Sequence, residues 1–361
     1  MSAARVHLTA IASAPRPAGS EPERKAREYC AGVLRGIGCD VAEHPFEYST
    51  FPGRWGTPLF GAAVAVLMFV AAREGRGGHG ALALAALLIG AAILSACGRW
   101  LGRSGVLDLP FARARSTNLV ATRGAPMLWL VAHLDSKSQP IPIGVRAIAI
   151  IACIIVLGVA MGVSVAQMVV SMPPLVWPAL AVAELLAALP VMASVVGARS
   201  PGALDDASGV ASLLRTVEML PRETAIGVLL TSAEELGLAG ARAWARQAPP
   251  SSGINIDGVD DVGSMRLICS GRAPRALQQR LGTSWPAASR LVPGVLMDGV
   301  ALADAGWEIV NISKGGWRTV SRIHTPSDDL AHLDGSGVEE LARSLAMSLT
   351  APVPLTRERL V

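Results

Sequence analysis

The chain has 361 residues, of which 51% are hydrophobic and only 17% are charged, with a formal net charge of +4. This composition is too apolar for an ordinary soluble enzyme and too polar for a protein that lies wholly within a membrane. No run of Lys and Arg of the kind that binds nucleic acid occurs, so we expect no nucleic-acid partner and predict a soluble body with a few membrane spans.

The five cysteines are odd in number and scattered along the chain, and no Cys-x-x-Cys motif occurs. We therefore expect neither a disulfide framework nor a cysteine-bound structural metal. The first twenty residues lack the apolar core of a secretory signal peptide, which favours a soluble part that starts in the cytoplasm.

The first half of the chain contains a predicted helix, a strand and an apolar hairpin. Ser20 and Glu23 have the spacing of a capping box and open a helix over 20–37, and residues 39–49 predict a strand. Residues 51–98 hold two apolar arms that predict a first transmembrane hairpin. Because each arm is close to the lower limit of about 17 residues for a span, a buried pair of soluble helices is the alternative.

Two further strands and a second hairpin follow. Strands are predicted at 117–123 and 127–134, on either side of a Gly-Ala-Pro turn, and we expect them to form a meander with the strand at 39–49. Residues 143–198 predict a second transmembrane hairpin, since its two apolar runs exceed 18 residues and carry a single charge, Glu184. Glu184 marks either a polar pathway through the membrane or a helix-packing position.

The rest of the chain has the pattern of an α/β domain. Helices are predicted at 209–220, 238–247 and 337–350, and strands at 225–232, 253–257, 264–270 and 307–313. We therefore predict one discontinuous soluble domain, interrupted by the two hairpins, that consists of residues 1–50, 115–142 and 199–361.

Acidic residues and histidines gather where the predicted strands of this domain end. They are His133 and Asp135, Asp205 and Asp206, Glu234 and Glu235, Asp257, and His324 with Asp328. Strand ends at one edge of an α/β sheet are where ligand sites assemble. Imidazoles and carboxylates together suit zinc, and a shared carboxylate can bridge two ions. Each pair alone is typical of an ordinary turn or strand end, but the whole set predicts a metal site.

Five motifs carry these residues: HLDS at 133–136, DDASG at 205–209, AEELGLAG at 233–240, NID at 255–257 and IHTPSD at 323–328. The set resembles the co-catalytic di-zinc aminopeptidases, a family that also holds glutamate carboxypeptidases and glutaminyl cyclases. The resemblance covers most of the soluble chain and fails over the two apolar blocks. It implies a mixed, mainly parallel sheet flanked by helices, here with about four inserted transmembrane helices.

The resemblance also implies a role for each residue of the set. The implied metal ligands are His133 and Asp257 for one zinc ion, Glu235 and His324 for a second, and Asp205 between them. Glu234 would be the general base and acid of the reaction. Asp135 would support catalysis by orienting His133, and Asp328 would do the same for His324. The implied activity is release of N-terminal residues from peptides with the help of two zinc ions.

Three other functions stay open from the sequence. A glutaminyl-cyclase-like acyltransferase would use one zinc ion, and a catalytically inactive peptidase-like membrane scaffold would have lost ligands. A transporter is a weaker candidate, because only about four spans are predicted. The complete ligand set and the DDASG motif favour the peptidase, whose expected partners are peptide substrates and a lipid bilayer.

Basic residues near the predicted hairpins lie mostly on the side of the soluble domain. They are Arg54, Arg99, Arg103, Arg113, Arg115, Lys137, Arg146 and Arg199, against Arg73 and Arg76 on the far side. The positive-inside rule then predicts a multi-pass membrane protein whose catalytic domain is cytoplasmic. If the meander forms, both hairpins leave from the sheet edge that carries the site, and we expect the site to face the membrane.

Overall fold

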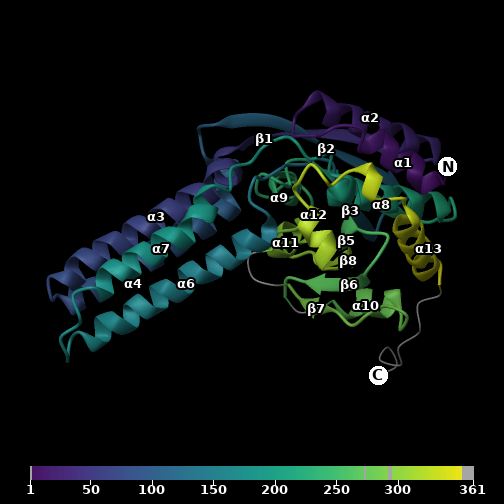
Figure 1. Ribbon diagram of the computed structural model, residues 1–361. Helices are drawn as coiled ribbons and strands as arrows, with labels where there is room; N and C mark the ends of the chain where they lie inside the picture. The colour runs from purple at the N-terminus through teal and green to yellow at the C-terminus, as the bar shows by residue number, and fades with distance from the viewer. Residues whose placement is uncertain (1, 272–273, 292–294, 352–361) are drawn as a thin grey trace, which may run out of the picture. The chain divides into compact units, whose positions relative to one another are not determined.

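The computed structural model describes residues 2–271, 274–291 and 295–351. The chain divides into two units, and each is assembled from separate segments (Figure 1). Unit 1 consists of residues 1–48, 113–138 and 198–361, and unit 2 consists of residues 49–112 and 139–197. Unit 2 is thus made of two insertions into unit 1.

Unit 1 is built on an eight-stranded sheet with the order β1-β2-β4-β3-β5-β8-β6-β7. The strands are β1 (Asp40–Ser49), β2 (Arg113–Arg123), β3 (Leu128–His133), β4 (Ile226–Thr231), β5 (Ser252–Val259), β6 (Ser264–Cys269), β7 (Ser289–Arg290) and β8 (Glu308–Gly315). The central strands β4, β3, β5 and β8 run parallel, whereas β2 and β6 run antiparallel to β4 and β8. The predicted mixed, mainly parallel α/β fold is confirmed.

The predicted meander of the first three strands is wrong. β4 lies between β2 and β3, pairing antiparallel with the first and parallel with the second. Every residue of β4 is buried, whereas most residues of the edge strand β1 are at least partly exposed. A strand that is apolar along its whole length is stable only where both faces of the sheet are covered, which places β4 in the interior.

Helices cover both faces of this sheet. They are α1 (Ala3–Ile11), α2 (Glu21–Gly36), α8 (Ser208–Met219), α9 (Ala239–Ala245), α10 (Arg275–Leu281), α11 (Asp298–Asp304), α12 (Trp317–Arg322) and α13 (Ser336–Thr350). α1, α2, α8 and α13 share one hydrophobic core with the sheet, and α9 and α11 share another. The two cores hold the sheet rigidly between layers, so groups at its edge keep fixed positions.

Unit 2 is helical throughout most of its length. Its helices are α3 (Phe51–Arg76), α4 (Gly80–Trp100), α6 (Ile143–Ala166) and α7 (Val176–Met192), and the π-helical turn Leu101–Gly105 joins α4 to α5 (Val106–Asp108). Three helical segments are long and apolar enough to cross a membrane, with lengths of 26, 29 and 24 residues.

The lengths of these helices differ from those expected. The arms of the first hairpin are longer than predicted, because α3 continues through polar residues to Arg76 and α4 continues to Trp100. The fourth predicted span is shorter, since α7 has only 17 residues. It starts after the Pro173-Pro174 pair, which cannot extend a helix, and it ends two residues after Pro190.

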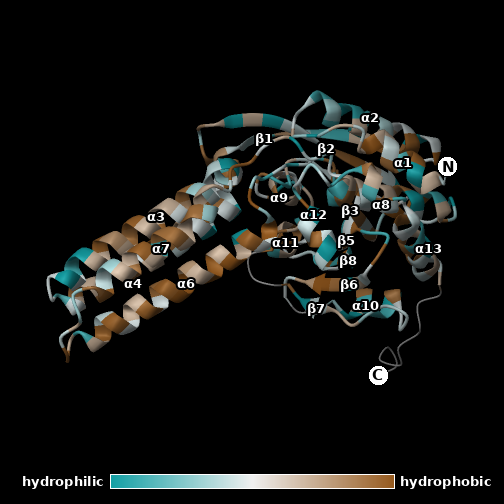
Figure 2. Cartoon of the chain, viewed as in Figure 1, coloured by the Kyte–Doolittle hydropathy of each residue, from teal (hydrophilic) through white to brown (hydrophobic). Residues whose placement is uncertain are grey.

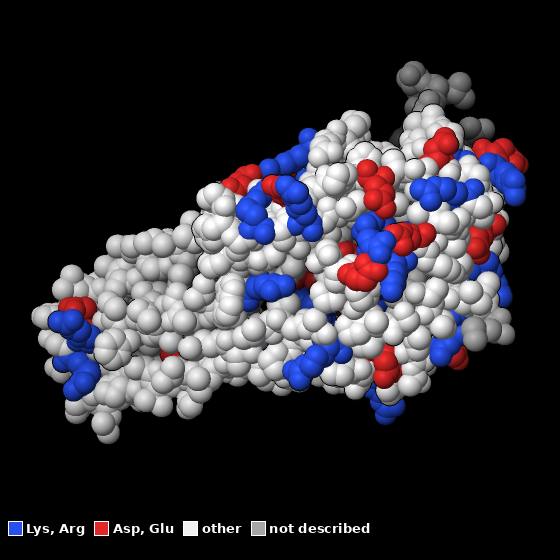
Figure 3. All heavy atoms as spheres, turned by 90° about the horizontal axis from the view of Figure 1, so that it is seen from above, with Lys and Arg blue, Asp and Glu red and all other residues white. Residues whose placement is uncertain are grey.

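The surface of the unit 2 helices is strongly hydrophobic (Figure 2). Large apolar side chains are well exposed on α3, α4, α6 and α7, including Phe69 at 68%, Ile89 at 60% and Ile154 at 63%. One face carries few charged residues along its middle, with Lys and Arg gathered at the ends (Figure 3). Such a surface is unfavourable in water and suits contact with lipid.

One acid lies inside unit 2. Glu184 of α7 is fully buried, and neither of its carboxyl oxygens has a hydrogen-bond partner among the described residues. Elsewhere in the same unit, Ala188 of α7 and Cys153 of α6 belong to a small buried cluster. This placement is consistent with both roles considered for Glu184 and favours neither.

Candidate metal centre

The five predicted metal ligands come together at the carboxyl ends of the parallel strands. His133 is the last residue of β3, Asp257 lies near the end of β5, and Glu235 follows β4. Asp205 precedes α8, and His324 follows α12. Their donor atoms form two groups, His133–Asp205–Asp257 and Asp205–Glu235–His324, and within each group these atoms lie within 4.8 Å of one another. Asp205 belongs to both groups, which we call the first and the second donor group.

Asp205 contacts both histidines, one with each carboxyl oxygen. Its Oδ1 lies 3.0 Å from His133 Nε2, and its Oδ2 lies 3.1 Å from His324 Nε2. His324 Nε2 also lies 3.2 Å from Glu235 Oε1. The buried Glu235 Oε1 has no hydrogen-bond partner in the part of the chain that the structure describes. A buried carboxyl oxygen without a donor is costly, and a cation would satisfy it.

Asp135 holds three parts of the site in place. Its carbonyl oxygen lies 3.0 Å from His133 Nδ1, and its carboxylate Oδ1 lies 3.6 Å away. The same carboxylate accepts hydrogen bonds from the backbone N–H groups of Glu234 and Glu235, at 3.0 and 3.2 Å. The fully buried Asp135 therefore fixes both the ring of His133 and the two glutamates after β4.

The second histidine lacks such support. Asp328 accepts hydrogen bonds from the backbone N–H groups of Leu204 and Asp205, at 2.6 and 3.2 Å, instead of contacting His324. His324 Nδ1 is buried and has no hydrogen-bond partner among the described residues. The expectation that Asp328 orients His324 is therefore wrong, and Asp328 positions the backbone at Asp205.

The DDASG turn is held by Asp206. Its buried carboxylate accepts backbone hydrogen bonds from His133, Gly209 and Gly258, at 3.2, 3.0 and 3.1 Å, and so ties β3, α8 and β5 together. The peptide bond between Asp205 and Asp206 is cis. A Cβ atom at Gly209 would lie 2.2 Å from Asp206 Oδ1, which explains why glycine stands there.

Buried carboxyl groups crowd the site and repel one another. Burial and the neighbouring Asp205 raise the pKa of Asp257 to about 7, and burial raises the pKa of Asp298 to about 6. Burial also raises the pKa of Glu234 well above its usual range, despite the attraction of His133. Concentrated negative charge with two imidazoles among the donors fits zinc, so the residues present suit the implied metal.

Four residues outside the predicted set of metal ligands and catalytic residues lie around the site. Lys137 Nζ lies 2.6 Å from Glu235 Oε2, and the buried Asp298 accepts a hydrogen bond from Thr231 Oγ1. Glu23 accepts a hydrogen bond from the Gly19 N–H at the start of its own helix, and its other carboxyl oxygen accepts one from Ser232 Oγ, two residues before Glu234. Apart from Gly19, these partners are far apart in the sequence, so no local pattern signals them.

The fourth is Arg16, which is fully buried and clamps the segments that carry the ligands. Its guanidinium donates to the carbonyl oxygens of Leu134 at 2.8 Å, Gly202 at 3.0 Å and Pro201 at 2.5 Å. It also donates to Ile11 at 3.2 Å. Arg16 thus joins the residue after His133 to the turn that leads to Asp205.

Replacing Arg16 with methionine is expected to destabilise unit 1 strongly. The change removes the Arg16 donor from the carbonyl oxygens of Ile11, Leu134 and Pro201, whereas Gly202 keeps the Ala207 N–H. Each buried acceptor left unsatisfied costs about 1–3 kcal/mol, so a loss of roughly 3 kcal/mol or more is expected. Thermal unfolding of the purified protein measures it. Arg24→Met is the matched control, because Arg24 is half-exposed and pairs only on the surface of α2. Equal unfolding midpoints for the two variants would contradict the clamp.

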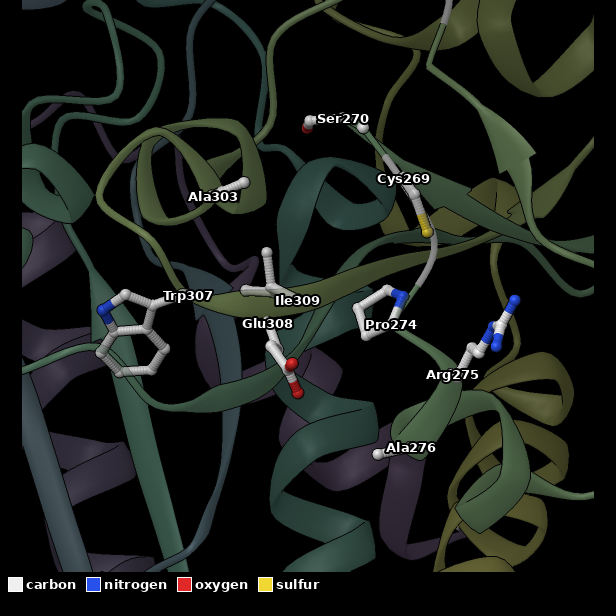
Figure 4. Close-up of a pocket in the computed structure, with 10 residues that line it drawn as sticks. Cys269, Ser270, Pro274, Arg275, Ala276, Ala303, Trp307, Glu308 and Ile309 are labelled. Carbon is white, nitrogen blue, oxygen red and sulfur yellow. The ribbon is translucent and has the colours of Figure 1, made fainter. Parts of the chain in front are cut away.

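A separate pocket of about 490 Å³ lies at the opposite edge of the sheet (Figure 4). Cys269 at the end of β6, Arg275 at the start of α10 and Trp307 and Glu308 at the start of β8 are among its lining residues. None of the predicted metal ligands or catalytic residues is among the residues that line it. The amino end of β8 is remote from the carboxyl ends of the parallel strands, so this pocket is distinct from the metal centre.

Solved structures with the same fold are aminopeptidases and glutaminyl cyclases. An aminopeptidase from Aneurinibacillus sp. strain AM-1 shares 15% identity, with 96% of this chain and 92% of that one covered and a TM-score of 0.56. A zinc aminopeptidase from Bacillus subtilis shares 15% identity, with 96% and 93% covered and a TM-score of 0.53. A glutaminyl cyclase from Fimbriiglobus ruber shares 13% identity, with 96% and 94% covered and a TM-score of 0.54.

No curated protein matches the sequence. Residues 188–349, however, match peptidase family M28. This segment contains Asp205, Glu234, Glu235, Asp257 and His324, while His133 lies before it. The resemblance found in the sequence motifs is therefore confirmed: residues 188–349 match the model of peptidase family M28, and solved zinc aminopeptidases share the fold.

Proposed function

We propose that this protein is a membrane-anchored aminopeptidase that holds two zinc ions, one in each donor group. The observation that carries the proposal is the shared position of Asp205, whose two carboxyl oxygens face different histidines. His133, Asp205 and Asp257 would hold one ion, and Asp205, Glu235 and His324 the other. When bound, zinc would polarise the scissile carbonyl and lower the pKa of the attacking water.

Glu234 is the group placed to move protons. It follows β4 directly beside the two donor groups, and its Oε2 lies 3.9 Å from His133 Nε2. Its backbone is held by Asp135, so the carboxylate is presented from a fixed position. As general base it would take the proton of the attacking water and hand it to the leaving amine.

A cyclase-like reaction is the second candidate, supported by the glutaminyl cyclases among the structures with this fold. The two reactions separate in one assay with the purified full chain and short peptides. Release of free N-terminal residues from unblocked peptides supports the aminopeptidase. Formation of pyroglutamate from peptides that begin with glutamine supports the cyclase. If a zinc-loaded protein carries out neither reaction, the result favours an inactive scaffold.

We further propose that unit 2 anchors the protein in a membrane. Support comes from its three long apolar helices and from the apolar side chains that they expose. The expected partners are accordingly a lipid bilayer and peptides, and no basic surface suggests nucleic acid. The basic flanks favour a cytoplasmic catalytic domain.

The chain passes from unit 1 into the two insertions at the sheet edge that carries the donor groups. β2 starts at Arg113 and runs antiparallel to β4, so its start lies at the edge where Glu235 follows β4. A hydrogen bond of 2.9 Å from Thr50 N–H to the Ala112 carbonyl brings the end of β1 to the same place. The second insertion departs after Ser138, five residues beyond His133. The chain returns to unit 1 beside the same point, since the Arg199 N–H donates to Ser138 Oγ at 2.9 Å. These crossings therefore belong to the edge that carries the donor groups, even though the predicted meander is wrong.

Single cysteines test this topology in sealed, right-side-out cells. In a background without Cys97, which is exposed, a cysteine at Gly77 between α3 and α4 should react with an impermeant thiol reagent. A cysteine at the exposed Arg222 of unit 1 should be protected until the cells are opened. The reverse pattern would place the catalytic domain outside, and protection of both would contradict a spanning first hairpin.

A further inference from the structure

The second donor group contains a ligand that is already paired with a cation. Glu235 Oε2 lies 2.6 Å from Lys137 Nζ, while Oε1 of the same carboxylate faces His324 and Asp205. Both side chains are largely buried, with 17% of Lys137 and 4% of Glu235 exposed. Such a pair is poorly screened by water, so the ammonium group acts strongly on Glu235.

The first donor group has the opposite surroundings. His133 Nδ1 is bonded to Asp135, and the carboxyls of Glu234 and Asp206 act on the same ring. Asp298 and Glu235 add negative charge at Asp257. No Lys or Arg pairs with His133, Asp205 or Asp257 among the ion pairs of the described residues. This group therefore offers a doubly charged cation more negative charge than the second group does.

The two histidines differ in the same direction. A ring nitrogen that donates to a carbonyl or carboxylate makes the other nitrogen a better metal ligand, and loss of that partner typically costs about 10–100-fold in affinity. His133 has such a partner, whereas His324 Nδ1 has none among the described residues. The ligand histidine of the second group thus adds to the effect of Lys137.

We propose that Lys137 makes the two zinc positions unequal, by opposing the ion held by Asp205, Glu235 and His324. Lys137 is a positioning residue that competes for the charge of Glu235. The first donor group then keeps its zinc, and the second exchanges its zinc with the medium. The inference rests on the proposed two-zinc function. It adds the residue that makes the zinc affinities of the two donor groups different. It makes occupancy of the second position, and with it activity, depend on available zinc.

Zinc titration of the full chain in detergent, against a competing chelator, tests this inference without an activity assay. In the wild-type protein we expect two dissociation constants that are clearly separated. Lys137→Met should lower the weaker constant by about tenfold or more and change the tighter one far less, because Glu235, which belongs to the second donor group alone, loses the cation paired with it. Lys137→Arg keeps the charge and should behave like the wild type. Lys25→Met is the matched control, since Lys25 is exposed on α2.

Two results would overturn the inference. In Lys137→Met, the dissociation constant of the more weakly bound zinc ion could stay the same or increase. Either result would mean that the lysine only holds Glu235 in place. Lys137→Gln and thermal unfolding of each variant guard against a folding defect. A wild-type protein that binds no zinc would overturn the proposed function and this inference together, whereas two bound ions with an unaltered weaker constant would overturn the inference alone.

Discussion

Replacing Glu234 with glutamine is expected to lower peptide hydrolysis by about 10²–10⁴-fold, the usual contribution of a general base. The amide has nearly the same size but cannot accept a proton from the attacking water. Zinc content should stay close to that of the wild type, because Glu234 belongs to neither donor group. The measurements are kcat/KM on an unblocked peptide and elemental analysis of the same preparation.

The matched control for this variant is Glu308→Gln, since Glu308 is exposed at the amino end of β8, away from the metal centre. It should keep full activity. A Glu234→Gln protein with near-normal turnover would remove Glu234 from the mechanism. Loss of zinc along with activity would instead give Glu234 a role in holding the metal.

Asparagine at position 205 should remove most of the zinc from both donor groups at once. Asp205 offers one oxygen to each group, whereas asparagine has a single oxygen and an NH₂ group that repels a cation. We expect less than one zinc per chain by elemental analysis and no measurable peptidase activity. Asp40→Asn, on the exposed start of β1, is the control and should keep both ions.

If the Asp205→Asn protein retains two zinc ions, Asp205 is not a ligand shared by both donor groups. Retention of a single tightly held ion would be informative in another way. It would show that His133 and Asp257 suffice for one position, and that Asp205 serves only the second donor group. Either result would change the assignment of ligands and leave the fold as described.

The positions of three of the five donor residues could be predicted from one local rule. His133, Glu235 and Asp257 each follow or end an apolar strand, and parallel strands bring their carboxyl ends to one edge of the sheet. Asp205 and His324 were added by their motifs alone. The structure brings all five together, although they span 191 residues of sequence between His133 and His324.

The order of the strands could not be predicted in the same way. The short turn between β2 and β3 favoured direct pairing, but β4, about a hundred residues later, occupies the position between them. The apolar run from Ile226 to Thr231 did predict a strand that is buried along its whole length. What could not be seen was which two strands it would separate, because that depends on tertiary packing.

The residues that support the site were missed for a similar reason. Arg16 bonds to carbonyl oxygens 118 and 186 residues away, and Glu23 bonds to a serine 209 residues away. Lys137 follows the HLDS motif directly, yet its pairing with Glu235 appears only once β3 and β4 lie side by side. Sequence motifs identify groups that act on a substrate, whereas long-range contacts reveal the groups that hold them.

The two insertions also fix the order in which the protein can be made. β1 leaves the ribosome before α3 and α4, and β3 leaves before α6 and α7, whereas β4, β5 and β8 are synthesised after both helical pairs. The sheet cannot form until its central strands have been synthesised. The apolar helices must therefore reach a lipid or packed environment while unit 1 is still unfolded. His324 is the last ligand to emerge. The proposed membrane anchor is therefore complete before the metal centre can form. During synthesis, the metal centre never exists without the anchor.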